Sequence, residues 1–233
     1  RAAIERAFGA ARLVLCNSEG IAQAARDLAA RHPRVVRLGT DLPAAPAQDT
    51  GPLTLVTVAH LVGRKRHADV LRALWVLRER RPGLRYLVIG DGPERGALER
   101  LTRELGLQDR VEFTGQLEHA AALQRARRCH AFVMPSVDEA FGVAYIEAMA
   151  GWVPALGALG EPGPVEIARA GDGIRLVPPG DVELLAAALD ALVDDPGLLR
   201  DLGLRARETV EAAFTWEACG RATLAAYAEA LEP

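Results

Sequence analysis

Residues 135–149 are predicted to contain a change from strand to helix. Their sequence is Pro135-Ser136-Val137-Asp138-Glu139-Ala140-Phe141-Gly142-Val143-Ala144-Tyr145-Ile146-Glu147-Ala148-Met149. Just before them, the apolar run 131–134 ends at a proline, which is typical of a buried strand. Residues 143–150 contain neither glycine nor proline, so they are predicted to be helical. This strand, loop and helix form the repeating unit of an α/β protein.

Two glutamates, Glu139 and Glu147, are separated by seven residues in this segment. Glu139 falls in the loop, whereas Glu147 lies about one turn inside the helix. At a rise of about 1.5 Å per residue the carboxylates can be up to ~12 Å apart, about the span of a sugar, a diphosphate and a ribose. Between them, the helix N-terminus offers unpaired N–H groups and a partial positive charge to a diphosphate. The pattern therefore indicates a nucleotide-sugar site.

The rest of the chain alternates between strands and helices in the same way. A long helix is predicted over 68–80, and after Val182 the chain is almost all helix, with breaks at Pro196 and near 214–216. Such alternation predicts an α/β fold in which a parallel sheet carries helices on both faces. The predicted strands are 12–16, 35–38, 53–58, 86–89, 111–113, 132–134 and 153–156.

The composition excludes several classes of protein. The chain is 50% hydrophobic and 25% charged, as expected of an ordinary packed core, and its net charge of -3 argues against a general nucleic-acid partner. No apolar run approaches the ~18 residues of a membrane-spanning helix. Cys16, Cys129 and Cys219 are odd in number and widely spaced. They form neither a disulfide framework nor a zinc pattern, so we expect a cytoplasmic protein without a metal.

Five segments, taken in order, resemble the retaining glycosyltransferases with the GT-B fold, of the group 1 (family 4) type. The similarity to residues 135–149 would be weak by itself, because acidic pairs are common, but the ordered series is specific. It implies a Rossmann-like domain, the C-terminal donor-binding half of a GT-B fold. The other four segments are Val58-Ala59-His60-Leu61-Val62-Gly63-Arg64-Lys65, Leu87-Val88-Ile89-Gly90-Asp91-Gly92-Pro93, Val111-Glu112-Phe113-Thr114-Gly115 and Leu176-Val177-Pro178-Pro179-Gly180-Asp181.

The resemblance also implies a division of the chain. Residues 1–46 would be the trailing strand and helix of a missing N-terminal acceptor domain plus a linker, which is expected over 42–52. Residues 47–213 would be the donor-binding domain, and 214–233 a C-terminal helix. The hydroxyl acceptor, and any peripheral membrane contact, would belong to the missing domain. The fragment is therefore expected to be inactive without it.

The resemblance assigns Lys65 and Arg64, in the loop after residues 53–58, to the departing diphosphate, because fixed positive charge lowers the barrier to its departure. Gly63 lies in the same loop. His60 stands where the family usually has arginine, so either a protonated His60 or Arg64 completes the phosphate clamp. Arg66 stands where a glycine is usual, which leaves the conformation of this turn open.

The segment 135–149 supplies the other half of the implied site. Glu139 would contact hydroxyls of the transferred sugar, and Glu147 those of the ribose, since an ionised carboxylate can accept from a vicinal diol. The main-chain N–H groups of Phe141, Gly142 and Val143 would face the diphosphate, although Phe141 suits a core position equally well.

Leu117, with its neighbours Gly115 and Gln116, would lie against the base. No Asp-x-Asp pair is present, so the implied donor, a nucleoside-diphosphate sugar, is expected to bind without a metal or another cofactor.

Other candidates favour structural roles. Residues 90–93 lack the third glycine of a dinucleotide motif and are predicted to be a turn. Residues 160–164 suit either a mobile loop over the donor or a plain turn, and Glu166 preserves the end of a Gly-Gly-x-x-Glu pattern of the family. His119 and His130 have no carboxylate at ligand spacing, which favours core or surface positions.

Three other interpretations stay open. The first is a non-catalytic nucleotide-sugar-binding module. The second is an interaction scaffold that has lost the site, which His60, Arg66 and Trp152 favour as departures from the family pattern. The third is another enzyme of this fold, such as a sugar-nucleotide epimerase. The residues single out no particular base, sugar or acceptor.

Overall fold

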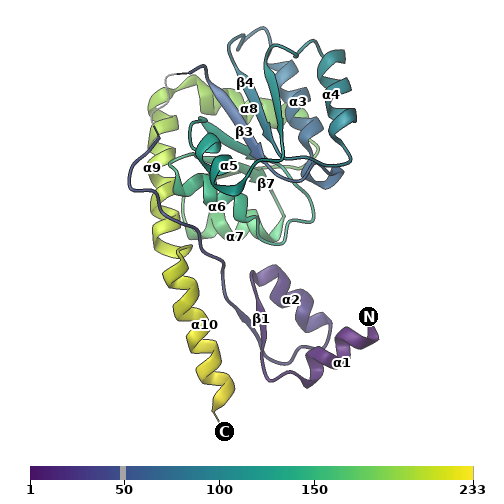
Figure 1. The fold of residues 1–233 in the computed structure, drawn as a ribbon, viewed down its shortest axis with the longest axis vertical. Helices are drawn as coiled ribbons and strands as arrows, with labels where there is room; N and C mark the ends of the chain where they lie inside the picture. The colour runs from purple at the N-terminus through teal and green to yellow at the C-terminus, as the bar shows by residue number, and fades with distance from the viewer. Residues whose placement is uncertain (48–50, 233) are drawn as a thin grey trace.

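The structure, a computed structural model, describes residues 1–47 and 51–232, and a parallel sheet lies at the centre of its main domain (Figure 1). Within the described residues this sheet has six strands in the order β5-β4-β3-β6-β7-β8, and every neighbouring pair is parallel. The predicted α/β fold is confirmed. The strands are β3 (Thr54–Val58), β4 (Arg85–Ile89), β5 (Val111–Gly115), β6 (Ala131–Met134), β7 (Ala155–Ala158) and β8 (Ile174–Val177).

Helices cover both faces of the sheet, as the alternation predicts. One face packs against α3 (His67–Val76), α4 (Arg95–Glu104) and α8 (Val182–Asp194). The other packs against α5 (His119–Ala126), α6 (Val143–Ala150) and α7 (Pro162–Ala170). The long helix α9 (Pro196–Ala213) contributes to both cores. Each fully buried leucine in these layers contributes about 2 kcal/mol by leaving water.

The C-terminal helices begin at capping residues that the sequence provides. The carboxylate of Asp181 accepts from the N–H of Leu184 at 2.9 Å, and Asp195 accepts from Gly197 just after the break at Pro196. Thr215 caps α10 (Trp216–Leu231) through the N–H of Ala218. These caps satisfy first-turn N–H groups that have no partner within the helix.

The order of the strands marks the place where a ligand crevice is expected in an open α/β sheet. The chain runs from β3 outward to β4 and β5, and then returns to place β6 on the other side of β3. At such a reversal, the loops after the two central strands diverge at their carboxyl ends, where ligands bind in open α/β sheets. In Figure 1 this end of the sheet faces the N-terminal part of the chain, residues 1–38.

The N-terminal part forms a small unit with its own core. It consists of α1 (Ala2–Ala10), β1 (Val14–Cys16), α2 (Glu19–Asp27) and β2 (Pro33–Val35), with β1 and β2 paired in parallel. Helix α10 extends from the main domain alongside this unit (Figure 1), and Arg34 on β2 donates to Glu229 on α10 at 2.8 Å. The buried residues of the small core are Cys16, Ala22, Ala25 and Ala30.

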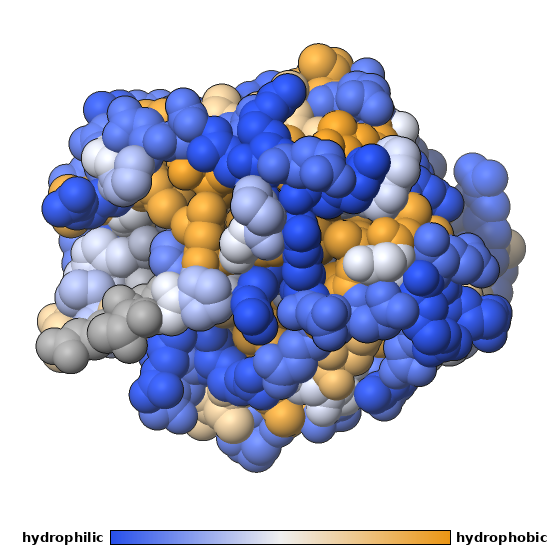
Figure 2. Space-filling model, turned by 90° about the horizontal axis from the view of Figure 1, so that it is seen from above, coloured by the Kyte–Doolittle hydropathy of each residue, from blue (hydrophilic) through white to orange (hydrophobic). Residues whose placement is uncertain are grey.

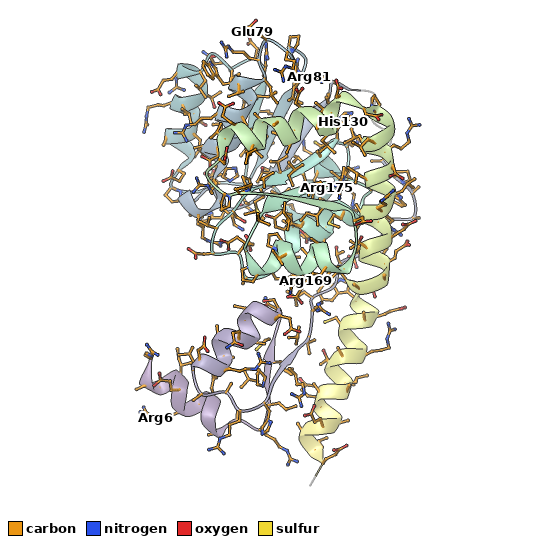
Figure 3. The ribbon with its side chains drawn as sticks, turned by 180° about the vertical axis from the view of Figure 1, so that it is seen from behind. Arg6, Glu79, Arg81, His130, Arg169 and Arg175 are labelled. Carbon is orange, nitrogen blue, oxygen red and sulfur yellow. The ribbon has the colours of Figure 1, made fainter. Side chains whose placement is uncertain are left out.

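The two ends of the main domain differ in character. Beside the amino ends of the strands, Arg81, which follows α3, forms an ion pair with α8. Its Nε lies 2.6 Å from Asp190 Oδ1. Figure 3 shows Arg81 and His130 at this end and Arg169, on α7, at the end that faces the N-terminal part.

Within the described residues, no helix combines the length and the apolar character that crossing a bilayer requires.

Several predicted boundaries were wrong. The strand expected at 35–38 lies at Pro33–Val35, the one expected at 153–156 lies at Ala155–Ala158, and the helix expected over 68–80 ends at Val76. The edge strand β8 was not predicted as a strand. Residues 48–50 of the expected linker lie outside the described residues.

Candidate functional site

The loop after β3 carries three basic residues in a tight turn. Gly63–Lys65 form one turn of 3₁₀ helix, and Arg66 then adopts a left-handed conformation, with φ 56° and ψ 35°, before α3 begins. A non-glycine residue in this region costs about 1–2 kcal/mol, which explains why glycine is the usual choice there. The Nε of Arg66 donates to Asp69 Oδ2 at 2.5 Å, which holds the side chain along α3. The turn therefore forms with arginine at this position.

The loop after β6 meets this turn directly. The N–H of Val137 donates to the carbonyl of Arg64 at 2.8 Å, and Arg64 Nη1 donates to the carbonyl of Asp138 at 3.3 Å. These contacts join positions more than seventy residues apart, because β3 and β6 are neighbours in the sheet.

Lys65 and Glu139 form the central ion pair of the crevice. Lys65 Nζ lies 2.5 Å from Glu139 Oε2, and the two side chains are only 11% and 8% exposed. The same oxygen accepts from Ser136 Oγ at 3.0 Å and lies 3.8 Å from Arg64 Nη1. Within the described part of the chain, Glu139 Oε1 accepts no hydrogen bond. One side of this carboxylate is thus committed to the protein, and the other is available to a ligand.

Helix α6 begins at a position that only glycine fits. Gly142 has φ 86°, and a Cβ there would lie 2.4 Å from Cδ2 of Tyr145. Among the described residues, the N–H groups of Phe141, Gly142 and Val143 donate to no protein acceptor. The ring of Phe141 is buried, with its centroid 5.7 Å from that of Phe214, so its side chain is a core residue. Only its main chain is suited to the role that the sequence analysis gave it.

Tyr145 is the buried residue that packs against the start of this helix. Its hydroxyl donates to the carbonyl of Met134 and lies 3.4 Å from Ser136 Oγ. Burial raises the pKa of Tyr145, so this hydroxyl stays protonated at neutral pH. Its proton is used by the Met134 carbonyl, and that of Ser136 is used by Glu139, so the two hydroxyls are in contact without a hydrogen bond between them.

Glu147 lies farther along α6 beside two basic side chains. Its Oε1 is 3.5 Å from Nε2 of His119, the first residue of α5, and its side chain is 15% exposed. Burial raises the pKa of Glu147, while the charges of His119 and Arg127 oppose the rise. His119 has a surface position, one of the two that the sequence favoured for it, but its pairing with Glu147 was not predicted.

The remaining predicted binding residues lie around this centre. His60 is exposed, and its charge helps to lower the pKa of Asp91, after the stronger effects of the Gly92 N–H and Arg95. Within the described residues no ion pair joins His60 to Glu139, whose cationic partners are Lys65 and Arg64. A Cβ added to Gly63 would have no neighbour within 4 Å. Leu117 is half-buried and packs against the core beneath α5 and α6.

Two glycines of the 90–93 turn are explained by packing. A Cβ on Gly90 would lie 2.0 Å from the carbonyl oxygen of Ala59, and one on Gly92 would lie 2.6 Å from that of Leu61. The turn therefore braces the loop after β3.

Glu166 is likewise structural. It is buried and accepts from Arg37 Nε at 2.6 Å and from the Glu19 N–H at 2.9 Å. These two hydrogen bonds tie α7 to the N-terminal part of the chain.

Glu161, which follows β7, has a contact with Glu139 that was not predicted. Its Oε2 accepts from the main-chain N–H of Glu139 at 2.9 Å. A further signal was available in the composition, because Lys65 is the only lysine among the 28 lysines and arginines of the chain. Lys65 therefore carries the only side-chain ammonium in the sequence, and an ammonium is a compact point charge, unlike the planar guanidinium of the 27 arginines.

A separate hollow lies at the opposite end of the sheet. It has a volume of about 560 Å³ and is lined by residues at the amino ends of β3, β4 and β5, among them Arg85 and Arg110, and by Arg128, which precedes β6. Figure 2 looks onto this end and shows a mostly hydrophilic surface with hydrophobic atoms visible between the polar side chains. It is remote from the Lys65–Glu139 pair, which lies beyond the carboxyl ends of the strands.

Comparison with known proteins gives consistent relatives. A glycogen synthase of Mycobacterium tuberculosis is 31% identical over 201 residues, which are 83% of this chain and 47% of that protein. An exopolysaccharide phosphotransferase of Streptomyces coelicolor is 38% identical over 156 residues, which are 66% of this chain and 16% of that protein. This chain therefore spans less than half the length of either relative.

Solved structures share the fold of this chain. The Anabaena protein HepE, solved in complex with UDP and glucose, superposes with a TM-score of 0.86 at 20% identity, over 98% of this chain and 66% of that one. The family model described as glycosyl transferases group 1 matches residues 40–209, that is, 170 of the 233 residues. The chain belongs to the group 1 glycosyl transferases.

Proposed function

We propose that this chain is the donor-binding half of a retaining glycosyltransferase of the family 4 type. It would transfer a sugar from a nucleoside-diphosphate sugar to a hydroxyl acceptor. The observation that carries the proposal is the buried Lys65–Glu139 pair at the carboxyl ends of β3 and β6. Beside it, α6 begins with N–H groups that donate to no acceptor in the described chain.

The positive groups would stabilise the leaving diphosphate. The side chain of Lys65 is only 11% exposed, so its charge acts at short range with little screening by solvent. Arg64, 45% exposed, would add charge at the mouth of the crevice, with His60 and Gly63 lining the approach. The N–H groups of residues 141–143 would complete the set. Fixed donors aimed at developing charge often lower the barrier of an enzymatic reaction more than any other single effect.

The two glutamates would hold the two ends of the donor. Glu139 keeps one oxygen for the protein, and its Oε1 would accept a hydroxyl of the transferred sugar. Glu147 would accept from the ribose hydroxyls, with the base near Leu117. No metal or other cofactor is part of this proposal. In place of Mg²⁺, Lys65, Arg64 and the helix N-terminus would neutralise the diphosphate oxygens of the donor.

The retaining outcome rests on the resemblance of residues 135–149 to that family. Proton NMR of the anomeric signal in the first-formed product tests it. A product with the anomeric configuration of the donor supports retention, and the inverted configuration contradicts it.

We further propose that residues 47–213 form the donor domain, that residues 1–46 are the trailing strand and helix of an acceptor-binding domain plus a linker, and that residues 214–233 are a C-terminal helix. The two-stranded β1–β2 sheet supports this, because parallel strands are normally covered on both faces, whereas Leu15 on β1 is 42% exposed. Leu224 and Tyr227 on α10 are also exposed, at 70% and 57%. A cytoplasmic enzyme, with any membrane contact made through the acceptor domain, fits this division.

Calorimetric titration of the chain with nucleoside diphosphates and their sugars tests the donor site. We expect saturable binding to one base, weakened at least tenfold by Lys65→Ala and by Glu147→Ala. Arg100→Ala, at an exposed position on α4, is the control and should bind like the wild type. Absence of binding to every nucleotide would refute the donor site.

The alternatives give different results in the intact enzyme with its acceptor domain. Donor binding without transfer would identify a non-catalytic module. Consumption of the donor without an acceptor, with a new sugar nucleotide as the product, would identify an epimerase.

A further inference from the structure

Glu161 occupies the start of α7, immediately after β7. It follows Gly160 and precedes Pro162, the first residue of the helix. Because β7 is the parallel neighbour of β6, the loops that follow these strands leave the same edge of the sheet. Glu161 therefore enters the crevice from the side of β7, whereas Glu139 enters it from β6.

Two hydrogen bonds fix these loops to each other around Glu139. Glu161 Oε2 accepts from the Glu139 N–H at 2.9 Å, and the Gly163 N–H donates to the Glu139 carbonyl at 3.2 Å. Burial raises the pKa of Tyr145, and the negative charges of Glu139 and Glu161 add to that effect.

Each of these carboxylates has one oxygen that the protein leaves unused. Glu139 Oε2 accepts hydrogen bonds from Lys65 and Ser136, while its Oε1 accepts none within the described chain. Glu161 Oε2 takes the Glu139 N–H, and its Oε1 likewise accepts from no described residue. Glu161 is half-buried and forms no ion pair with any described residue. Glu139 and Glu161 thus each offer one carboxylate oxygen to a ligand that brings donors, on two loops that are hydrogen-bonded to each other.

We propose that Glu161 is a specificity-determining residue of the donor site, where it accepts a hydroxyl or ammonium of the transferred sugar beside Glu139. The donor sugar would then be a neutral hexose or an amino sugar, and sugars that carry a carboxylate would be rejected. This rests on the proposed function and narrows its substrate class.

The physical basis is the sign of the charges around the sugar. The cations Lys65 and Arg64 lie against Glu139 on the side assigned to the diphosphate. Beyond them, the crevice presents two carboxylates. A uronic acid would place a third negative charge against Glu139 and Glu161, whereas hydroxyls satisfy both unused oxygens. Hydrogen bonds to charged acceptors change affinity by roughly 10- to 100-fold.

The test compares matched sugar nucleotides on the same nucleotide. Affinities are measured by calorimetry for UDP, UDP-glucose and UDP-glucuronate, and for GDP, GDP-mannose and GDP-mannuronate. The series whose free nucleoside diphosphate binds is used. Loss of that binding in Lys65→Ala tests the donor site itself. The ratio between neutral and acidic sugar tests Glu161 separately, so the two proposals can fail independently.

Two variants separate charge from position. Glu161→Gln keeps an amide oxygen to accept from the Glu139 N–H but removes the charge. It should reduce the preference for the neutral sugar over the uronate by roughly tenfold or more, with the affinity for free diphosphate unchanged. Glu161→Ala should also weaken the neutral sugar nucleotide, roughly 10-fold or more. Glu104→Gln, at an exposed position on α4, should change neither value.

The outcomes that overturn the proposal are distinct. They are a wild-type chain that binds the uronate as well as the neutral sugar, a Glu161→Gln variant that keeps the full preference, or a Glu161→Ala variant that weakens free diphosphate as much as the sugar nucleotide.

Discussion

His67, two residues after Lys65, is a buried imidazole whose titration should control acid stability. It is 2% exposed, and its Nδ1 lies 3.1 Å from the hydroxyl of Tyr86. Thr57 Oγ1 donates to the Val133 carbonyl, so the Tyr86 hydroxyl donates to Thr57, 2.8 Å away, and accepts from His67 Nδ1–H. In this tautomer Nε2 carries no proton, and it has no partner among the described residues.

Burial, and then the nearby charge of Lys65, lowers the pKa of His67 to about 4. In the unfolded chain the ring takes up a proton near its ordinary pKa of about 6.5. At pH values between these two pKa values, His67 is protonated in the unfolded state and neutral in the folded state. The stabilising contribution is therefore complete above pH ~6.5 and is lost as the pH falls towards about 4. The difference in pKa corresponds to roughly 3 kcal/mol of unfolding free energy.

His67→Gln removes the titration while keeping a donor for Tyr86. We expect the variant to lose about 1 kcal/mol at pH 7.5 from imperfect packing. Between pH 7.5 and 4.5, its unfolding free energy should fall by roughly 3 kcal/mol less than that of the wild type. Urea unfolding followed by circular dichroism at the two pH values measures this. His32→Gln, at an exposed histidine, should keep the wild-type slope. An equal fall in His67→Gln and the wild type would show that the reasoning is wrong.

Three further predictions concern the site. In the intact enzyme, Lys65→Ala should lower kcat/KM by about 10²- to 10³-fold, because no other described cation lies as close to Glu139. Steady-state transfer measures this, and full activity would remove Lys65 from the mechanism. Gly142→Ala should lower the free energy of unfolding by about 2–4 kcal/mol through a left-handed φ and a clash with Tyr145. The matched control, Gly160→Ala, has the same φ of 86° but nothing within 4 Å of its Cβ, so it should lose only about 1–2 kcal/mol. Equal losses in the two variants, measured by urea unfolding, would contradict the packing argument. Finally, burial raises the pKa of Glu147 and His119 opposes the rise, so nucleotide affinity should be full at high pH and be lost as the pH falls through this raised pKa. His119→Gln should move that loss to higher pH in calorimetric titrations, and a move to lower pH would count against the pairing.

Much of the main domain could be predicted because its elements carry local signals. Helix α6 has the predicted bounds, since Gly142 starts it and Gly151 follows its last residue. The edge strand β8 was missed because Arg175 interrupts its short apolar run. Strand β7 is displaced because Pro154 has no N–H and the pairing with β8 continues as far as Ala158.

The site could be predicted only in part. The residue types and their loops follow from strand ends, but the contact of Lys65 with Glu139 depends on β6 lying beside β3. That adjacency is a property of strand order, which local sequence patterns do not encode. Glu161 and His119 were missed for the same reason, because each reaches its partner across neighbouring elements.

The single lysine has an experimental consequence. Lysine labelled with ¹⁵N at Nζ would give this protein one side-chain ammonium resonance, and that resonance would come from the centre of the crevice. In the unliganded chain the ammonium faces a carboxylate, and with a diphosphate bound it would face phosphate oxygens. Its chemical shift and its rate of proton exchange would therefore follow donor occupancy directly, without a mutation or an attached probe.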